Sequence, residues 1–165
     1  IMNWYTIIKA ADQQLSELSW KLPNFESEWE EVSGNNQYAK HFPDKSIWLE
    51  KAQSHGSMVA VDKDWEISNT DFPVSLQDQE LSSIIEEPKM NRVSKLIRSK
   101  STIELPILLR DHSGYTLIGG NTRLVMADAM GYTPRAWVID IRDTASGKTF
   151  EVPSGEARTI EIGEV

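Results

Sequence analysis

The stretch from Tyr115 to Gly131 places the tightest limits on how this chain can fold. Residues 115–118 (YTLI) have the aromatic and β-branched character of a strand, and Gly119-Gly120 interrupts them. An apolar, periodic segment then runs to Gly131, where a glycine suits the end of a helix. The order predicts a strand, a glycine turn and a helix, which Asn121 or Thr122 can cap.

The start of this helix is the principal candidate for a binding site. The first N–H groups of a helix lack partners within it, and its N-terminus carries partial positive charge, so both favour an anion such as phosphate. Arg123, in the first turn, adds a guanidinium that can hold two oxygens at once. The sequence equally allows an ordinary strand-to-helix turn with a surface arginine, because a short glycine turn is a weak motif.

Strands are expected on both sides of this stretch. Residues 104–110 (ELPILLR) are apolar, and residues 111–114 (DHSG) have the composition of a hairpin turn. The two strands that flank this turn should therefore pair antiparallel. Residues 135–140 (RAWVID) predict a further strand after the helix.

The first part of the chain is expected to be mostly helical. Residues 3–20 repeat apolar side chains at helical spacing, residues 21–43 are polar with a loop at 33–36, and Asp44 can cap a helix to about Ser54. Residues 57–61 predict a buried strand. The polar part holds an acidic group that is either a solvated face or a metal site: Glu26, Glu28, Glu30 and Glu31.

Between that strand and residue 104, residues 72–76 predict a short edge strand or an extended lead-in, and residues 78–86 a helix that Pro88 closes. Residues 88–103 contain no acid and hold five cations: Lys89, Arg92, Lys95, Arg98 and Lys100. Val93, Leu96 and Ile97 would lie on the opposite face of that helix. The basic face is either simply solvated or directed at phosphates or DNA.

Composition excludes several classes of function. The chain has no cysteine, and its three histidines lie far apart, so thiol chemistry, disulfides and a zinc site are not expected. No apolar run approaches the roughly 20 residues that span a bilayer, and no secretory signal is evident, so we expect a cytoplasmic protein without a membrane partner. The formal net charge of −8 disfavours nucleic acid except at the basic segment.

Residues 93–140 resemble the ParB/sulfiredoxin superfamily. The resemblance rests on the strand Leu105-Pro106-Ile107-Leu108-Leu109, the strand that ends at Gly119-Gly120, and Asn121-Thr122-Arg123 at the start of a helix. The Asn-Thr-Arg variant is similar to ParB-like proteins common in phage genomes. The resemblance implies an α+β fold: a small mixed sheet with packed helices. Residues 68–142 would form the ParB/sulfiredoxin-like domain, residues 1–67 a helical N-terminal extension with a strand, and residues 143–165 a C-terminal hairpin or tail.

The resemblance also implies a nucleotide, ATP or CTP, with Mg²⁺ as a further candidate cofactor. Its phosphates would bind to Gly119, Gly120, Asn121, Thr122 and Arg123, with Lys95 and Arg98 neutralising the remaining charge. Arg123 is the firmest match and a candidate catalytic residue, and Asp71 is the candidate acid that activates a hydroxyl or water. Asn121 stands where sulfiredoxin has its cysteine, and partition ParB proteins carry a glutamate and two arginines in the motif where this chain keeps one arginine.

Two functions therefore remain open. The first is a nucleoside-triphosphate-dependent phosphotransferase or hydrolase, or a nuclease, acting in phage or bacterial nucleic-acid or nucleotide metabolism. The second is a non-catalytic module that binds a nucleotide, DNA through the helix at 89–100, or a host protein as a regulator or inhibitor.

Overall fold

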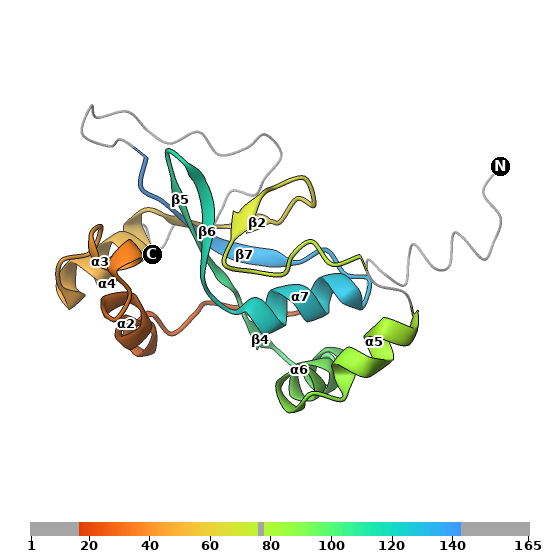
Figure 1. Ribbon diagram of the computed structural model, residues 1–165. Coiled ribbons are helices and arrows are strands. Elements are labelled where there is room, and N and C mark those ends of the chain that lie inside the picture. Colours follow the sequence, from red (N-terminus) through yellow and green to blue (C-terminus); the bar gives the residue numbers. More distant parts are fainter. Residues whose placement is uncertain (1–16, 76–77, 143–165) are drawn as a thin grey trace, which may run out of the picture.

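A five-stranded mixed sheet forms the centre of the computed structural model, which describes residues 17–75 and 78–142 (Figure 1). Its strand order is β2 (Gly56–Ala60), β7 (Arg135–Asp140), β5 (Ile107–Asp111), β6 (Gly114–Gly119) and β3 (Ile67–Ser68). The pairs β2–β7 and β5–β6 are antiparallel, whereas β5–β7 and β3–β6 are parallel. The expected α+β class with a mixed sheet is confirmed at this level.

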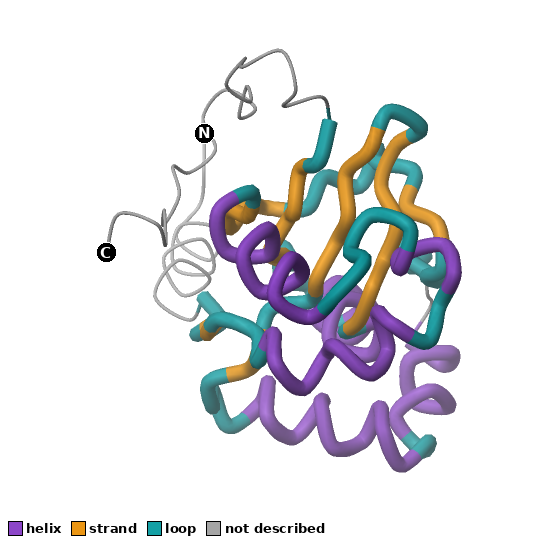
Figure 2. The backbone as a smooth tube through the Cα atoms, turned by 90° about the vertical axis from the view of Figure 1, so that its left-hand side faces the viewer, coloured by secondary structure: helices purple, strands orange, loops and turns teal. Residues whose placement is uncertain are grey.

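The helices form two groups on the sheet. One group consists of α2 (Phe25–Ser33), α3 (Asn36–Ala39) and α4 (Lys45–Ser54), and the other of α5 (Asp78–Ile85), α6 (Pro88–Arg98) and α7 (Asn121–Ala129). A separate two-stranded sheet pairs β1 (Trp20–Lys21) with β4 (Ile103–Glu104) in parallel. Figure 2 shows the turn between β5 and β6 extending beyond the helices.

Alternation along the central strands divides the core between the two sheet faces. Successive side chains of a strand point to opposite faces. Ile107 and Leu109 therefore join the buried cluster of the N-terminal helices, while Leu108 packs with Leu124 of α7 on the other face. The first cluster combines residues from the expected N-terminal extension (residues 1–67) with residues from the expected domain (residues 68–142). It includes Phe25, Val32, Tyr38, Trp48, Ile118 and Trp137.

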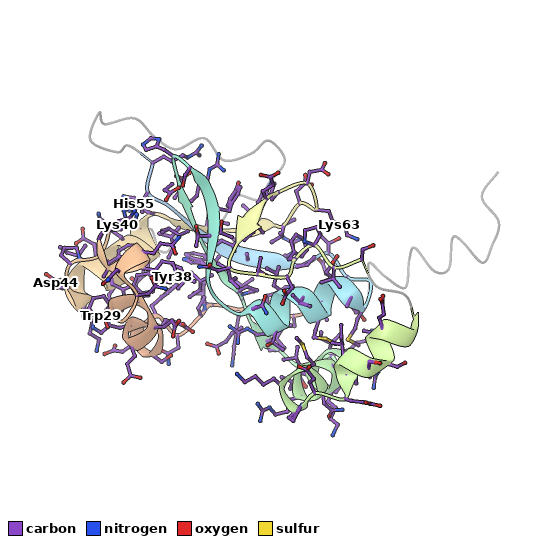
Figure 3. The ribbon with its side chains drawn as sticks, in the orientation of Figure 1. Trp29, Tyr38, Lys40, Asp44, His55 and Lys63 are labelled. Atoms are coloured by element: carbon purple, nitrogen blue, oxygen red, sulfur yellow. The ribbon has the colours of Figure 1, made fainter. Side chains whose placement is uncertain are left out.

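Buried hydrogen bonds fix the N-terminal helices against the sheet. The Trp137 indole donates to the Ala52 carbonyl at 2.7 Å, and the Tyr38 hydroxyl donates to the Leu117 carbonyl at 2.7 Å. Tyr38 lies between these helices and the sheet in Figure 3. Gly56 leaves room for the Trp137 ring, since a Cβ there would overlap its Nε1 and Cε2 atoms. Polar groups of buried aromatic residues are thus satisfied by the backbone of neighbouring elements.

Several expected elements are confirmed. Helix α4 follows Asp44, whose carboxylate accepts the Ile47 N–H at 2.9 Å, and ends before Gly56. The β5–β6 hairpin turns at residues 112–113. Helix α7 ends before Gly131, which adopts a left-handed conformation (φ +90°), and β7 follows. Each of these rests on a local signal, which is a cap, a turn or a glycine.

Other expectations are wrong. Trp20–Lys21 is a strand rather than the end of a helix, because its backbone pairs with Ile103–Glu104; residues 1–16 lie outside the described part. The loop expected at residues 33–36 is confined to Gly34-Asn35, and α2 and α3 lie on either side of it within the polar segment 21–43. The helix expected at residues 78–86 is confirmed as α5, which ends before Pro88, but Pro88 also begins α6, since the first position of a helix needs no N–H.

The strand expectations also need correction in two places. Residues 72–75 form no strand in the described structure, and the edge strand is Ile67–Ser68. The run 104–110 is divided at Leu105-Pro106 into β4 and β5. On α6, Ile97 is buried as expected, but Leu96 is 41% exposed. The hairpin expected near the C-terminus lies outside the described residues.

Candidate anion-binding site

The site begins where β6 ends and α7 starts, at Gly119 and Gly120. Gly120 occupies the N-cap position with φ +91°, and no side chain caps the helix. The expectation that Asn121 or Thr122 caps α7 is therefore wrong. Asn121 is used differently: its Oδ1 accepts the Thr70 hydroxyl at 2.6 Å and the Asp71 N–H at 3.3 Å. The start of α7 is thus left without a side-chain acceptor for its first N–H groups.

Arg123 folds back over this glycine. A Cβ on Gly120 would lie 2.7 Å from the Pro106 Cα and 2.9 Å from the Arg123 Nη2. The guanidinium therefore lies close to the start of α7, in space that only a glycine leaves open. The positive φ of Gly120 adds a second requirement, because residues with a side chain rarely adopt it.

The guanidinium of Arg123 has unused hydrogen-bonding capacity. Its side chain is half-buried, its Nε atom is buried without a hydrogen-bond partner, and it forms no salt bridge with the described residues. A guanidinium offers five N–H donors in a fixed plane, and buried donors normally have acceptors. An oxygen-rich ligand at the start of α7 would supply such acceptors.

The Glu28 carboxylate lies within electrostatic range of the Arg123 guanidinium, and the Glu104 carboxylate lies within range of Glu28. Glu28, on α2, is half-buried, and its Oε2 would lie 3.0 Å from a Cβ on Gly119. Burial raises the pKa of the Glu28 carboxyl; the positive charge of Arg123 lowers that pKa, and the negative charge of Glu104 raises it further. Glu104, on β4, also accepts the Asn24 N–H at 3.0 Å. The turn is therefore a mixed-charge site rather than a purely positive one.

Glu28 is the functional candidate that the sequence interpretation missed. It belongs to the acidic group interpreted as a solvated face or a metal site. A better signal was available, since Phe25, Glu28 and Val32 recur at i, i+3 and i+7, which puts them on one helix face. Phe25 and Val32 are buried, so Glu28 is carried inward with them.

Of the other candidate residues, some belong to the turn or are hydrogen-bonded to it, and others are not. Gly119 to Arg123 form one continuous turn, and the Asp71 backbone is held to it by Asn121. Asp71 is exposed and lines a separate pocket of about 390 Å³ that also includes Val74, Ile84, Glu87, Met90 and Val125. Lys95 and Arg98 are exposed on α6, and within the described structure no salt bridge or side-chain hydrogen bond joins either of them to the turn. Their part in the site stays a prediction.

In residues 17–75 and 78–142, no group of three or more His, Asp or Glu residues is arranged to hold a metal ion. Within the same residues, the helices are too short or too polar to cross a bilayer.

No protein-family model, curated protein or solved structure matches this chain. The ParB/sulfiredoxin resemblance therefore rests on the motif within residues 93–140.

Proposed function

We propose that the turn from Gly119 to Arg123 binds the phosphate groups of a nucleotide, ATP or CTP. The observation that carries the proposal is the Arg123 guanidinium, whose buried Nε has no partner, beside the uncapped start of α7. A helix N-terminus and a guanidinium attract the same oxyanion from adjacent positions. The motif resemblance supports the same ligand.

The carboxylates of Glu28 and Glu104 determine in which ionic form the nucleotide can bind. Phosphate oxygens beside Glu28 and Glu104 would be repelled at close range unless a cation lies between them or Glu28 is protonated. Mg²⁺ prefers oxygen ligands and commonly binds through one or two carboxylates together with phosphates. We therefore expect the Mg²⁺ complex of the nucleotide to be the ligand.

The reaction we propose is transfer or hydrolysis of the terminal phosphoryl group. Such reactions need positive charge at the phosphates and an acid side chain that orients or deprotonates the attacking hydroxyl or water. Arg123 would supply the charge. Glu28 is the better base, because burial raises its pKa and it lies beside the turn, and Asp71 is the alternative base.

A non-catalytic nucleotide-binding module is the second candidate. One observation favours it: Asn121 stands at the cysteine position of sulfiredoxin, and its side chain is engaged by Thr70 and Asp71. It therefore organises the turn and offers no nucleophile there. The two candidates share the ligand and differ in whether the bound nucleotide turns over.

Calorimetric titration of the full chain with ATP and CTP, with and without Mg²⁺, tests the proposal. We expect Arg123→Gln to weaken binding by about 10- to 100-fold, since a hydrogen bond to a charged group contributes about 1.5–3 kcal/mol. The matched control is Arg92→Gln, an equal charge change on the exposed face of α6. The proposal would be refuted if neither ATP nor CTP bound, or if Arg123→Gln and Arg92→Gln weakened nucleotide binding equally.

Phosphate release from the bound nucleotide then separates the two candidates. Turnover that Glu28→Gln abolishes while binding remains would support the enzyme and identify Glu28 as the base. If Asp71→Asn abolished turnover and Glu28→Gln did not, Asp71 would be identified as the base. Binding without turnover across a panel of hydroxyl acceptors would favour the module.

A further inference from the structure

A second charged surface lies on α6, on the side that faces away from the core. Helix α6 buries Ser94 and Ile97, and it partly buries Met90 and Val93 next to α5 and α7. The basic stripe, as we call it, consists of five exposed cations: Lys89, Arg92, Lys95, Arg98 and, just after the helix, Lys100. A step of three residues advances about 4.5 Å along a helix and turns about 60° back around it. The stripe therefore crosses the exposed half of α6 diagonally over about 13 Å between Lys89 and Arg98.

The cations of the stripe have no partners in the described structure. None of the five forms a salt bridge or a side-chain hydrogen bond there, and the nearest acids along the chain, Glu86 and Glu87, precede the helix. Several cations elsewhere form salt bridges. Lys45 pairs with Glu26 at 2.7 Å, and Arg135 pairs with Glu17 at 3.0 Å. The stripe is thus a concentration of uncompensated positive charge on a chain whose formal net charge is −8.

The helix dipole accounts for only part of the stripe. Cations in the last turn of a helix are favourable, which explains Lys95 and Arg98. Lys89 lies in the first turn and Arg92 follows closely, where the dipole opposes positive charge. Like charges three or four residues apart also cost a few tenths of a kcal/mol each. The isolated fold therefore gains little from Lys89 and Arg92, and such uncompensated charge is the pattern expected of a surface that meets a polyanion.

We propose that the basic stripe binds the phosphate backbone of duplex nucleic acid. The chemistry of the face selects this partner. Single-stranded nucleic acid is held largely by stacking on aromatic rings, and residues 88–100 contain none. A lipid surface needs a broad exposed apolar face, and Leu96 is the large apolar side chain exposed on α6. A convex helix with cations fits a groove between two phosphate strands.

Because the stripe reaches phosphates rather than base edges, the binding is independent of sequence and sensitive to salt. Each phosphate contact contributes a slope of about −0.9 to the dependence of log K on log salt. Five contacts therefore give a slope of about −4.5, which is roughly a 10⁴-fold loss of affinity between 25 and 200 mM salt. The acidic remainder of the chain restricts measurable binding to the low-salt end.

Fluorescence anisotropy of a labelled 20-base-pair duplex, titrated with the full chain across this salt range, tests the inference. We expect Arg92→Gln with Lys95→Gln to reduce the slope by about 1.8. The control, Lys40→Gln with Lys45→Gln, removes the same charge from α4 and the segment before it, away from α6 (Figure 3), and should leave the slope unchanged. Arg123→Gln should also leave it unchanged, which separates this surface from the nucleotide site.

Three results would overturn the inference. The first is no binding of the duplex at 25 mM salt. The second is an equal change of slope in the stripe and control variants, which would mean that only net charge matters. The third is tighter binding to a single strand of the same length, to phosphatidylserine vesicles or to polyglutamate, because each of these would assign the stripe to another class of partner.

Discussion

Gly120→Ala is the substitution that most directly tests how the candidate anion-binding turn is built. The new methyl group would lie 2.7 Å from the Pro106 Cα and 2.9 Å from the Arg123 Nη2, and the residue would have to keep φ at +91°. The same helix provides its own control. Gly131 follows the other end of α7 with φ +90°, and a Cβ there would meet no atom within 4 Å. Comparison of the two alanine variants therefore isolates the contacts from the backbone conformation.

The magnitudes follow from those two terms. A left-handed conformation costs a residue with a side chain about 1–2 kcal/mol, and both variants share this cost. Gly120→Ala adds an overlap with the backbone of Pro106, which cannot move aside as a flexible side chain could, and overpacking costs about 1–3 kcal/mol. In a chain of this length 1 kcal/mol shifts Tm by about 2–4 °C. We expect Tm to fall by about 4–20 °C in Gly120→Ala, where the two terms total about 2–5 kcal/mol, and by about 2–8 °C in Gly131→Ala.

Binding supplies the second measurement. Displacement of the Arg123 guanidinium should remove the stabilisation by Mg²⁺-ATP or Mg²⁺-CTP, which at a ligand concentration of 100 times Kd is about 2.7 kcal/mol. Differential scanning calorimetry gives the two Tm values, and titration calorimetry well below Tm gives the affinities. Equal losses of Tm in the two variants would refute the contact argument. Full nucleotide affinity in a folded Gly120→Ala variant would refute the placement of the ligand.

Three other predictions concern the framework around the site. Gly56→Ala should cost about 2–5 kcal/mol in urea unfolding, because its methyl group overlaps the Trp137 indole and threatens the hydrogen bond to Ala52. Tyr38→Phe should cost about 1–3 kcal/mol in the same assay, since the Leu117 carbonyl loses its buried donor. Burial raises the pKa of Glu28 above 4.5. The contribution of the Glu28 carboxyl to the free energy of unfolding is therefore fully present below that pH and is lost as pH rises through the folded pKa. Glu28→Gln should flatten this dependence of stability on pH, as measured by chemical denaturation at a series of pH values.

The parts of the fold that the sequence predicts are those with local signals. The Asp44 cap, the hairpin turn at residues 111–114 and the glycine after α7 each determine the backbone within a few residues. The same holds for the turn itself. Its two glycines and Arg123 are close together in the chain, so their proximity needs no tertiary information, and the pattern predicts either an anion site or an ordinary strand-to-helix turn.

The parts that the sequence interpretation missed depend on distant partners. Trp20–Lys21 is too short to read as a strand and becomes one only by pairing with Ile103–Glu104. Helix α2 contains four glutamates and two buried apolar side chains, which resembles a solvated segment until the cluster that covers Phe25 and Val32 is known. Tertiary packing, rather than propensity, forms these elements.

The same packing decides what the candidate site can do. Arg123 alone, at an open helix N-terminus, would attract any anion. Helix α2 places the Glu28 carboxylate against Gly119, so the positive charge is partly balanced before a ligand arrives. A free anion would be repelled by that carboxylate. A phosphate that arrives with a divalent cation would not, because the carboxylate can bind the cation or lie beside its positive charge. Under the proposed function, the N-terminal helices would therefore select among the anions that the turn alone would accept.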